Sequence, residues 1–569
     1  MYSDKENVNT LTALLVAHGV EKAVVCPGSR NAPIVHNLNE CGQMECFPVT
    51  DERSAGFYAL GLCLQTGKPV VVCVTSGSAL LNVAPAVVEA FYRHMPLIVV
   101  SADRPAAWIG QLDGQTMVQP GALAGYVRTA VTLPEPNAPT ARWHCNRLAN
   151  EALCLATLGG RGGPVHINVP ISEPLFNFTV KELPQERVIR LMRPTFKLEP
   201  QHDLWAALLG ATKPMVVVGQ MACGAIAEST MQRLAESFVV VSEPLGHSRG
   251  AVHFDEVVLR CANAEALMPD FVLYIGDTLV SKRMRRFLRQ AKAPACLLTP
   301  DASTLADPLM SLTQVVEYCG NDCLNALLAD LADSRSTSPK CDPADSRNIS
   351  LKCDPSFLAL WREALAEASS RACDYEPPYS QMAVVKYFEE QLDDIGYAFH
   401  THYANSSEVR LANIYSRHYV WCNRGINGIE GSLSTAAGFS LATTDRVFCI
   451  IGDLSFFYDQ NALWNTRLRG NLRIVLLNNG EGGIFRQLHG LSASPAARDY
   501  VAGAHSTTAQ GICSQNDIGY IRATNMAEMQ MGMVTLLTRD ASRPMVLEVF
   551  TNADADAKAM QEYLEYPKH

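Results

Sequence analysis

The chain has 569 residues, of which 48% are hydrophobic and 18% charged, and its formal net charge is −10. This length predicts several domains, and the acidic balance argues against a general nucleic-acid surface. No apolar run is long enough to cross a bilayer and the first ten residues are polar, so we expect a cytoplasmic protein without membrane insertion. The 18 cysteines form no CxxC pair, which favours free thiols over disulfides or zinc ligands.

Short β-branched runs alternate with helix-like stretches along most of the chain, which is typical of parallel α/β domains. We assign residues 1–187 to a first domain, in which a helix is expected over 78–92. Its expected strands lie at residues 22–26, 69–75, 96–101 and 164–169.

A second set of expected strands assigns residues 188–335 to a central α/β domain, which lacks a GxGxxG phosphate loop. These strands lie at residues 214–219, 238–242, 271–276 and 295–299.

Residues 336–357 belong to a stretch rich in Ser, Asp, Pro and Lys, which predicts a linker or a surface insertion. The tetrapeptide KCDP occurs twice in it, and a local duplication is a simpler interpretation than a metal site. Residues 358–569 form the third predicted domain, whose expected strands lie at 396–400, 447–452, 473–478 and 544–550. The predicted fold class is therefore α/β, with three parallel-sheet domains in series.

The segment 446–485 carries the most specific pattern of the chain. One apolar run ends in Gly452-Asp453, and a second ends in Asn478-Asn479. Two strands of one parallel sheet would place both polar ends on the same edge, where ligands bind in open α/β sheets. Asp453 and Asn479 offer hard oxygen donors of the kind that Mg²⁺ uses when it also binds phosphate oxygens. The alternative is an ordinary pair of strands that happen to end in Asp and Asn.

The GD…NN pattern resembles the signature of thiamine-diphosphate (ThDP) enzymes, although Leu454 stands where glycine is common. Three α/β domains in series are also the layout of the ThDP decarboxylases and synthases. The resemblance implies ThDP and Mg²⁺ as cofactors, with Mn²⁺ as an alternative ion. It implies that the first domain binds the aminopyrimidine (PYR) and the third the diphosphate (PP). It further implies a homo-oligomer, a dimer or tetramer, with active sites between two chains.

Glu52 is the candidate catalytic residue, because a ThDP enzyme needs an acid against the aminopyrimidine. It follows a short apolar run and precedes a helix rich in small residues. The alternative is a solvated acid in a first helical turn, where the helix dipole favours it. Its neighbour Asp51 is expected to point elsewhere.

Arginine and glutamine side chains stand at several expected strand ends, at Arg30, Arg104, Gln115, Arg410 and Arg424. The planar guanidinium fork binds carboxylates, so a cluster of this kind predicts a substrate with more than one negative charge. The alternative for any one arginine is a surface ion pair.

The segments PGSRNAPI, DERSAGFYALGL, SADRP, NSSEVR and GDLSFFYD are similar to those of the menaquinone-pathway synthases within the ThDP family. This resemblance covers essentially the whole chain. It implies decarboxylation of 2-oxoglutarate and 1,4-addition of the resulting succinyl-semialdehyde carbanion to isochorismate.

The resemblance also implies site residues. The cofactor would contact Pro27, Thr75, Ser76, Asn82, Ser406, Gly428, Ile429, Gly452, Asp453, Leu454, Ser455, Asn479 and Ile484, with Ile429 as the apolar wedge beneath its rings. The metal would contact Asp453, Asn479 and Glu481, the last through its backbone carbonyl, at a position where many relatives carry glycine. The substrates would contact Ser29, Arg30, Arg104, Gln115, Lys282, Ser406, Arg410, Arg424, Ile484, Phe485 and Leu488.

Two other functions stay open. A carboligase of the acetolactate-synthase type would use pyruvate, a small donor that does not need several arginines. A non-catalytic ThDP-fold protein that binds a dicarboxylate would be expected to lose Glu52, Asp453 or Asn479, and all three are present.

Overall fold

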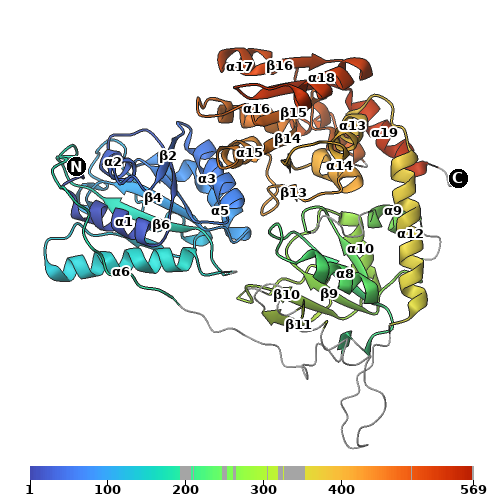
Figure 1. Cartoon of the computed structure of the whole chain (residues 1–569), viewed down its shortest axis with the longest axis horizontal. Helices are drawn as coiled ribbons and strands as arrows, with labels where there is room; N and C mark the ends of the chain where they lie inside the picture. Colours follow the sequence, from blue (N-terminus) through green and yellow to red (C-terminus); the bar gives the residue numbers. More distant parts are fainter. Residues whose placement is uncertain are drawn as a thin grey trace, which may run out of the picture.

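The computed structural model describes residues 1–159, 161–191, 207–208, 210–246, 253–260, 264–303, 305–317, 324–325, 328, 353–488 and 490–566. Most of the predicted linker, residues 336–352, lies outside these ranges. The described residues contain three β-sheets, and all strand pairs within these sheets are parallel. The predicted α/β fold class is therefore confirmed. Figure 1 shows the first sheet in blue and cyan, the central sheet in green and the third in orange and red.

The N-terminal sheet has the order β2-β1-β3-β4-β6-β5. Its strands are β1 (Lys22–Val25), β2 (Glu45–Pro48), β3 (Val70–Val74), β4 (Leu97–Asp103), β5 (Ala130–Thr132) and β6 (Val165–Pro170). Its helices are α1 (Glu6–Ala17), α2 (Ala32–Glu40), α3 (Glu52–Thr66), α4 (Ser78–Asn82), α5 (Ala84–Tyr92) and α6 (Pro139–Ala156). The single helix expected over 78–92 is thus two helices, separated at Val83, because Pro85 has no N–H for a continuous helix.

The central sheet has the order β11-β10-β9-β7-β8. Its strands are β7 (Pro214–Val218), β8 (Val239–Ser242), β9 (Phe271–Ile275), β10 (Ala295–Thr299) and β11 (Leu312–Glu317). The helices α8 (Glu228–Ser237), α9 (Phe254–Arg260) and α10 (Lys282–Ala291) belong to the same domain.

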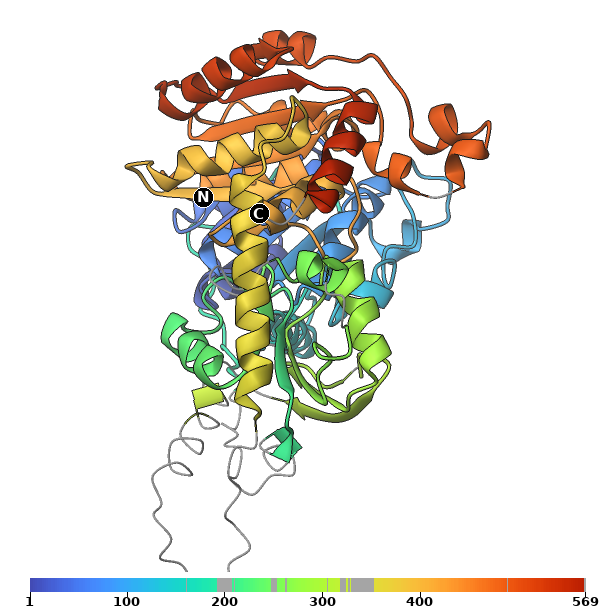
Figure 2. The same cartoon turned by 90° about the vertical axis from the view of Figure 1, so that its right-hand side faces the viewer.

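Helix α12 (Pro355–Asp374) connects two hydrophobic cores. Phe357, Trp361 and Ala368 belong to the core of the central domain, whereas Ala372 belongs to the core of the C-terminal domain. Figure 2 shows this long yellow helix running along both domains. It begins inside the predicted linker and crosses the boundary expected at residue 358, so that boundary stays a prediction.

The C-terminal sheet has the order β13-β12-β14-β15-β17-β16. Its strands are β12 (Phe399–Tyr403), β13 (Val420–Trp421), β14 (Arg446–Gly452), β15 (Leu472–Asn478), β16 (Gly519–Ala523) and β17 (Met545–Phe550). Its helices are α13 (Gln381–Asp393), α14 (Ser407–Tyr415), α15 (Ser432–Leu441), α16 (Asp453–Tyr458), α17 (Gln510–Gln515), α18 (Met526–Thr538) and α19 (Ala553–Glu565). None of the described helices has both the length and the apolar character that a membrane span needs.

Helices α3 and α15 join the N-terminal and C-terminal domains through a close backbone contact. A Cβ atom on Gly61 would lie 2.1 Å from the carbonyl oxygen of Thr435, and one on Gly438 would lie 2.2 Å from that of Tyr58. Only glycine allows two helices to approach so closely at these points. Since Glu52 is the first residue of α3, this contact also fixes the helix that carries the candidate acid.

Candidate active site

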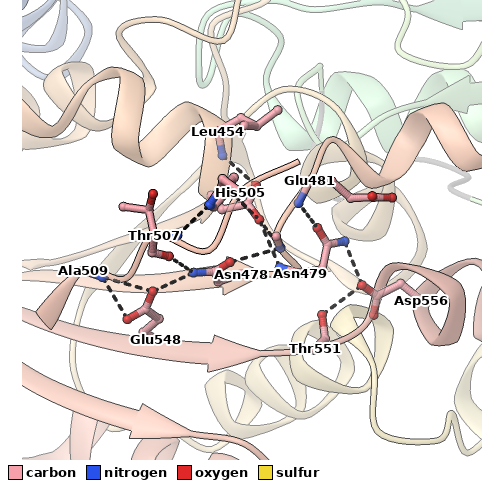
Figure 3. Close-up of polar contacts among 12 residues, drawn as sticks. Leu454, Asn478, Asn479, Glu481, His505, Thr507, Ala509, Glu548, Thr551 and Asp556 are labelled. Atoms are coloured by element: carbon pink, nitrogen blue, oxygen red, sulfur yellow. Dashed lines mark hydrogen bonds and ion pairs between the residues drawn. The ribbon is translucent and has the colours of Figure 1, made fainter. Parts of the chain in front are cut away.

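The candidate metal site lies where β14 and β15 end. Asp453 begins α16, and its Oδ1 accepts a hydrogen bond from the N–H of Leu454 at 2.7 Å. Its Oδ2 accepts from the N–H groups of Gly480 at 2.8 Å and Asn479 at 3.1 Å. Backbone donors from both strand ends therefore hold the carboxylate, and Figure 3 shows these contacts around Asn479 and His505.

Asp453 is only 3% exposed, and burial raises the pKa of its carboxyl group. Among the described residues no Lys or Arg lies within ion-pair distance of it; His505 Nε2 is the nearest basic atom, at 3.5 Å. The Nδ2 of Asn479 donates to Asp556 Oδ2 at 2.9 Å, which orients its amide. A buried carboxylate without a full positive partner, next to an amide oxygen, suits a hard cation that also binds phosphate.

Glu481 directs its carboxylate to an arginine. Its Oε1 accepts from Arg486 Nε at 2.5 Å and its Oε2 from Arg486 Nη2 at 3.1 Å, while Arg486 also pairs with Asp554 at 3.2 Å. In Figure 3 the Glu481 side chain extends away from Asn479 and His505. Within the described ranges no group of three His, Cys, Asp or Glu side chains forms a metal site. Any contact of Glu481 with a cation would thus come from its backbone.

A cavity of about 260 Å³ lies between the central and C-terminal domains. The structure brings four predicted residues to its wall: Lys282, Arg410, Asn479 and Ile484. Arg283 lines it as well. Glu243, Asp255, Glu256 and Asp556 line the same cavity, and Arg283 lies 3.7 Å from Asp255. Lys282 and Arg410 are therefore the cationic side chains best suited to bind an anionic group of a ligand there.

Two acids that line the cavity, the buried Glu243 and the half-buried Asp255, hold the turn that carries Lys282 and Arg283. Glu243 accepts hydrogen bonds from the N–H groups of Val280 at 2.7 Å and Ser281 at 2.8 Å, and burial raises the pKa of its carboxyl group to about 7. Ser281 is the N-cap of α10 and donates its hydroxyl to Asp255. Hydrogen bonds to these two acids therefore fix the first turn of α10, which carries Lys282 and Arg283.

The predicted wedge turn is held from two domains. Glu89 of α5 is buried and accepts from the N–H groups of Gly425 and Ile426, each at 2.9 Å. Asn405 Nδ2 donates to the carbonyl of Gly428 at 2.9 Å, and its Oδ1 accepts from Arg424 Nη1 at 3.1 Å. Ile429 itself is 43% exposed, so its side chain remains free for a ligand.

The remaining candidates lie in the N-terminal domain, in loops at the carboxyl ends of its strands, which we call the N-terminal rim. Asn82 Nδ2 donates to Glu52 Oε2 at 3.3 Å, and Thr75 and Ser76 are buried at the turn after β3. Arg30 donates to the carbonyl of Ile171 at 2.9 Å and pairs with Glu173 at 3.1 Å.

The substrate candidates of this rim are more open. Pro27 and Ser29 are exposed, and Arg104 lies 3.5 Å from Asp113. Gln115 is exposed and has a left-handed backbone with φ of 56°. None of the N-terminal candidates lines the cavity that holds Lys282 and Arg410.

The other candidates of the C-terminal domain flank the metal and cavity residues. Gly452, Leu454 and Ser455 adjoin Asp453, and Ser406 precedes α14 with φ of 86°. Phe485 lies in the short helix Gly483–Gln487, and Leu488 follows it.

Sequence reasoning did not single out Glu89, Glu243 or His505. Their partners come from segments far apart in the chain, so spacing gave no signal for them. The one available signal for Glu243 was its position directly after a strand, which it shares with many surface acids.

Comparison with known proteins identifies the family. Residues 7–122 match the family described as thiamine pyrophosphate enzyme, N-terminal TPP binding domain, and residues 405–549 match its C-terminal TPP binding domain. Two proteins named 2-succinyl-5-enolpyruvyl-6-hydroxy-3-cyclohexene-1-carboxylate synthase are similar over 99% of this chain: one from Bacteroides thetaiotaomicron, 40% identical over 99% of its length, and one from Phocaeicola vulgatus, 41% identical over 98%. A third of the same name, from Porphyromonas gingivalis, is 33% identical over 99% of this chain and 98% of its own.

Similarity over nearly the full length of each relative is what members of one family share. The chain belongs to the 2-succinyl-5-enolpyruvyl-6-hydroxy-3-cyclohexene-1-carboxylate synthase family of ThDP-dependent enzymes.

Proposed function

We propose that this chain decarboxylates 2-oxoglutarate and adds the succinyl-semialdehyde unit to isochorismate, giving 2-succinyl-5-enolpyruvyl-6-hydroxy-3-cyclohexene-1-carboxylate and CO₂. The observation that supports this best is the buried carboxylate of Asp453, held by backbone N–H groups beside Asn479, next to a cavity lined by Lys282, Arg283 and Arg410. Both proposed substrates carry two carboxylates, which the Lys282 and Arg410 side chains of this cavity can bind. We place the reaction in the cytoplasm. All described cysteines are free thiols, and free thiols persist in that reducing compartment.

The roles of the residues follow from their positions. When bound, ThDP supplies the electron sink that lets a 2-oxoacid lose CO₂. Asp453 and Asn479 would hold Mg²⁺ through side-chain oxygens, and Glu481 through its carbonyl. Glu52, whose carboxylate is oriented by Asn82, would hold a proton toward the aminopyrimidine. Lys282 and Arg410 would bind substrate carboxylates and exclude neutral donors.

Substitution of Glu52 tests the catalytic role. Glu52→Gln keeps the shape of the side chain, so ThDP should still bind while CO₂ release falls by about 1,000-fold. Glu151→Gln on α6 removes an exposed carboxylate that pairs with Arg147, and serves as the matched control with unchanged turnover. Full turnover by Glu52→Gln would remove the proposed role.

A donor comparison tests the substrate class. With isochorismate present, we expect CO₂ release from 2-oxoglutarate to exceed that from pyruvate, because pyruvate offers one carboxylate to a cavity with three cationic side chains. Mass spectrometry of the product identifies the acceptor. Faster use of pyruvate would favour a carboligase of the acetolactate-synthase type.

We further propose that the working site lies between two chains. The N-terminal candidates lie outside the cavity of the same chain, and the loop beside them exposes Trp108, Leu112 and Val118. Mixing equal amounts of refolded Glu52→Gln and Asp453→Asn chains should restore about a quarter of wild-type activity, because about half of the dimers are then mixed and one of the two sites in each is intact. A mixture as inactive as its components would place both residues in one chain's site.

A further inference from the structure

Gln119 lies in the long segment between β4 and β5, four residues after Gln115, and is 0% exposed. It is neither a charged group nor one of the residues expected at the site. Its side chain reaches the carboxyl ends of β4 and β6, beneath the turn that follows β3. A fully buried amide persists only where its hydrogen-bonding groups have partners.

The partners of Gln119 connect two functional loops. Its Oε1 accepts from the N–H of Gly77 at 2.8 Å, directly after Thr75 and Ser76. Its Nε2 donates to Asn168 Oδ1 at 2.8 Å and to the carbonyl of Ala102 at 3.1 Å. Because a backbone N–H can only donate, the contact with Gly77 fixes which end of the amide is oxygen.

The contact with Gly77 also bears on Gln115. Gly77 has φ of 83°, and a Cβ atom there would lie 3.3 Å from the backbone of Gln115. Gln115 itself has φ of 56°, a left-handed conformation that is unfavourable for a residue with a side chain. The turn at Gly77 and the loop at Gln115 thus lie directly against each other, and the Gln119 side chain hydrogen-bonds to the turn from within the same loop.

The same network continues to the charged residues of the rim. Asn168 Nδ2 donates to Asp103 Oδ2 at 2.9 Å, and Asp103 Oδ1 accepts from the N–H of Arg104 at 2.8 Å. Ser101 Oγ donates to Asn168 Oδ1 at 2.8 Å and lies 2.7 Å from His166 Nε2. Every step from Gly77 to Arg104 is a buried or half-buried hydrogen bond.

We propose that Gln119 is a positioning residue that couples the cofactor turn at Thr75–Gly77 to the substrate residues Gln115 and Arg104; the inference rests on the proposed function for the roles of those residues. Loss of its amide leaves the N–H of Gly77 without its acceptor and leaves the Oδ1 of Asn168 with the Ser101 hydroxyl as its one donor. The turn and the loop then lose their common support, and both binding events weaken together.

Gln119→Met tests this, since it keeps the length of the side chain and removes every hydrogen bond. We expect the dissociation constant of ThDP, measured by calorimetry with Mg²⁺ present, to rise about tenfold, and the KM for 2-oxoglutarate to rise by a similar factor. In contrast, Gln115→Ala should raise only the KM, and Ser76→Ala only the dissociation constant. A Gln119→Met protein that changes neither constant, or only one, overturns the proposal.

Asn150→Leu is the matched control, because Asn150 is also 0% exposed and its Nδ2 donates to the carbonyls of Asn146 and Arg187, away from the rim. It should lower the melting temperature as Gln119→Met does, with both constants unchanged. A parallel rise in this control would reduce Gln119 to a purely structural residue.

If Gln119→Met does not fold, Gln119→Asn supplies the same test. Its amide is retained but is one methylene too short to reach Gly77 and Asn168 together, so both constants should rise by a smaller, still equal factor. The ThDP measurement does not depend on the substrate. Failure of the 2-oxoglutarate reaction in the wild type would therefore refute the proposed function and leave the effect on ThDP binding to be judged separately.

Discussion

The N-terminal and C-terminal sheets share one strand order and differ in the chemistry at their carboxyl ends. Counted along its own part of the chain, each sheet runs second, first, third, fourth, sixth and fifth strand. The third strand is followed by Thr75 and Ser76 in one sheet and by Asp453 in the other. The strand frame therefore places the polar residues of both sheets at equivalent points, and the residues just beyond the strands give each sheet edge its own chemistry.

The sixth strands support these rims in different ways. In the N-terminal sheet, the neutral amide of Asn168 links Gln119 to Asp103. In the C-terminal sheet, the buried carboxylate of Glu548 accepts from Asn478 Nδ2 at 2.8 Å and from the hydroxyl of Tyr520 at 2.7 Å. The same position in the strand frame thus holds a neutral amide in the N-terminal sheet and a carboxyl group in the C-terminal sheet.

The largest effect is expected from Asp453→Asn. The change removes the negative charge that the cation needs, so ThDP affinity with Mg²⁺ present should fall by about 100-fold or more. Calorimetric titration measures it. Asp459→Asn is the control, because Asp459 is equally buried and accepts from the N–H and hydroxyl of Ser434, each at 2.7 Å. It should reduce stability and leave the affinity unchanged; equal affinities in wild type and Asp453→Asn would contradict the metal assignment.

Glu548→Leu should destabilise the C-terminal domain by about 3 kcal/mol, because it leaves the N–H of Ala509 and the Tyr520 hydroxyl without an acceptor and leaves Asn478 Nδ2 with the Thr507 carbonyl alone. Glu548→Gln retains one acceptor oxygen and should lose less. Chemical denaturation followed by tryptophan fluorescence measures both. Equal stability of the two variants would mean that the carboxylate contributes only its volume.

Gly61→Ala should destabilise the folded chain by about 2 kcal/mol, because the new methyl group meets the Thr435 carbonyl and forces α3 away from α15. Gly511→Ala in α17 is the matched control: its Cβ would meet nothing within 4 Å, and alanine favours the helix. Thermal melting compares the two. A neutral Gly61→Ala would show that the domains tolerate separation along this contact.

The smallest effect, taken per unit of pH, is the pH dependence from Glu389, which accepts from the hydroxyl of Tyr403 at 2.5 Å. Burial raises the pKa of its carboxyl group from 4.5 to about 8. The folded protein thus keeps a proton that the unfolded chain releases, and the free energy of unfolding falls as pH rises between these two values. Glu389→Gln removes this contribution, at most about 1.4 kcal/mol per pH unit.

Denaturation at pH 5, 6, 7 and 8 should therefore show the advantage of Glu389→Gln over wild type growing with pH. Glu390→Gln, on the neighbouring exposed position of α13, provides the control and should give a constant difference. A constant difference for Glu389→Gln as well would mean that its carboxylate is ionised in the folded protein throughout.

The sequence predicted the sheets and the rim around Asp453 because both follow from local signals. Apolar runs that end in Gly-Asp or Asn-Asn mark buried strands and the polar residues beyond them. The strand expected at 396–400 is observed at Phe399–Tyr403. It carries His400 and His402, whose rings both meet Phe439 edge-on, and His402 is buried. No local pattern indicates these aromatic contacts.

The supporting residues could not be predicted in this way. Gln119, Glu89 and Glu548 acquire their roles from partners between 17 and 337 residues away in the chain. The packing of α12 against two cores likewise had no local signal, because a sequence pattern can show that a helix buries one face and not which core receives it.

The placement of α12 determines how far the cavity between the central and C-terminal domains can change its width. A helix with Trp361 fixed in one core and Ala372 in another works as a strut, since bending it breaks backbone hydrogen bonds and withdrawing either end exposes apolar surface. The spacing between Lys282 and Arg410 is therefore set when the chain folds. A ligand that contacts both side chains would therefore have to match a spacing that the fold has already set.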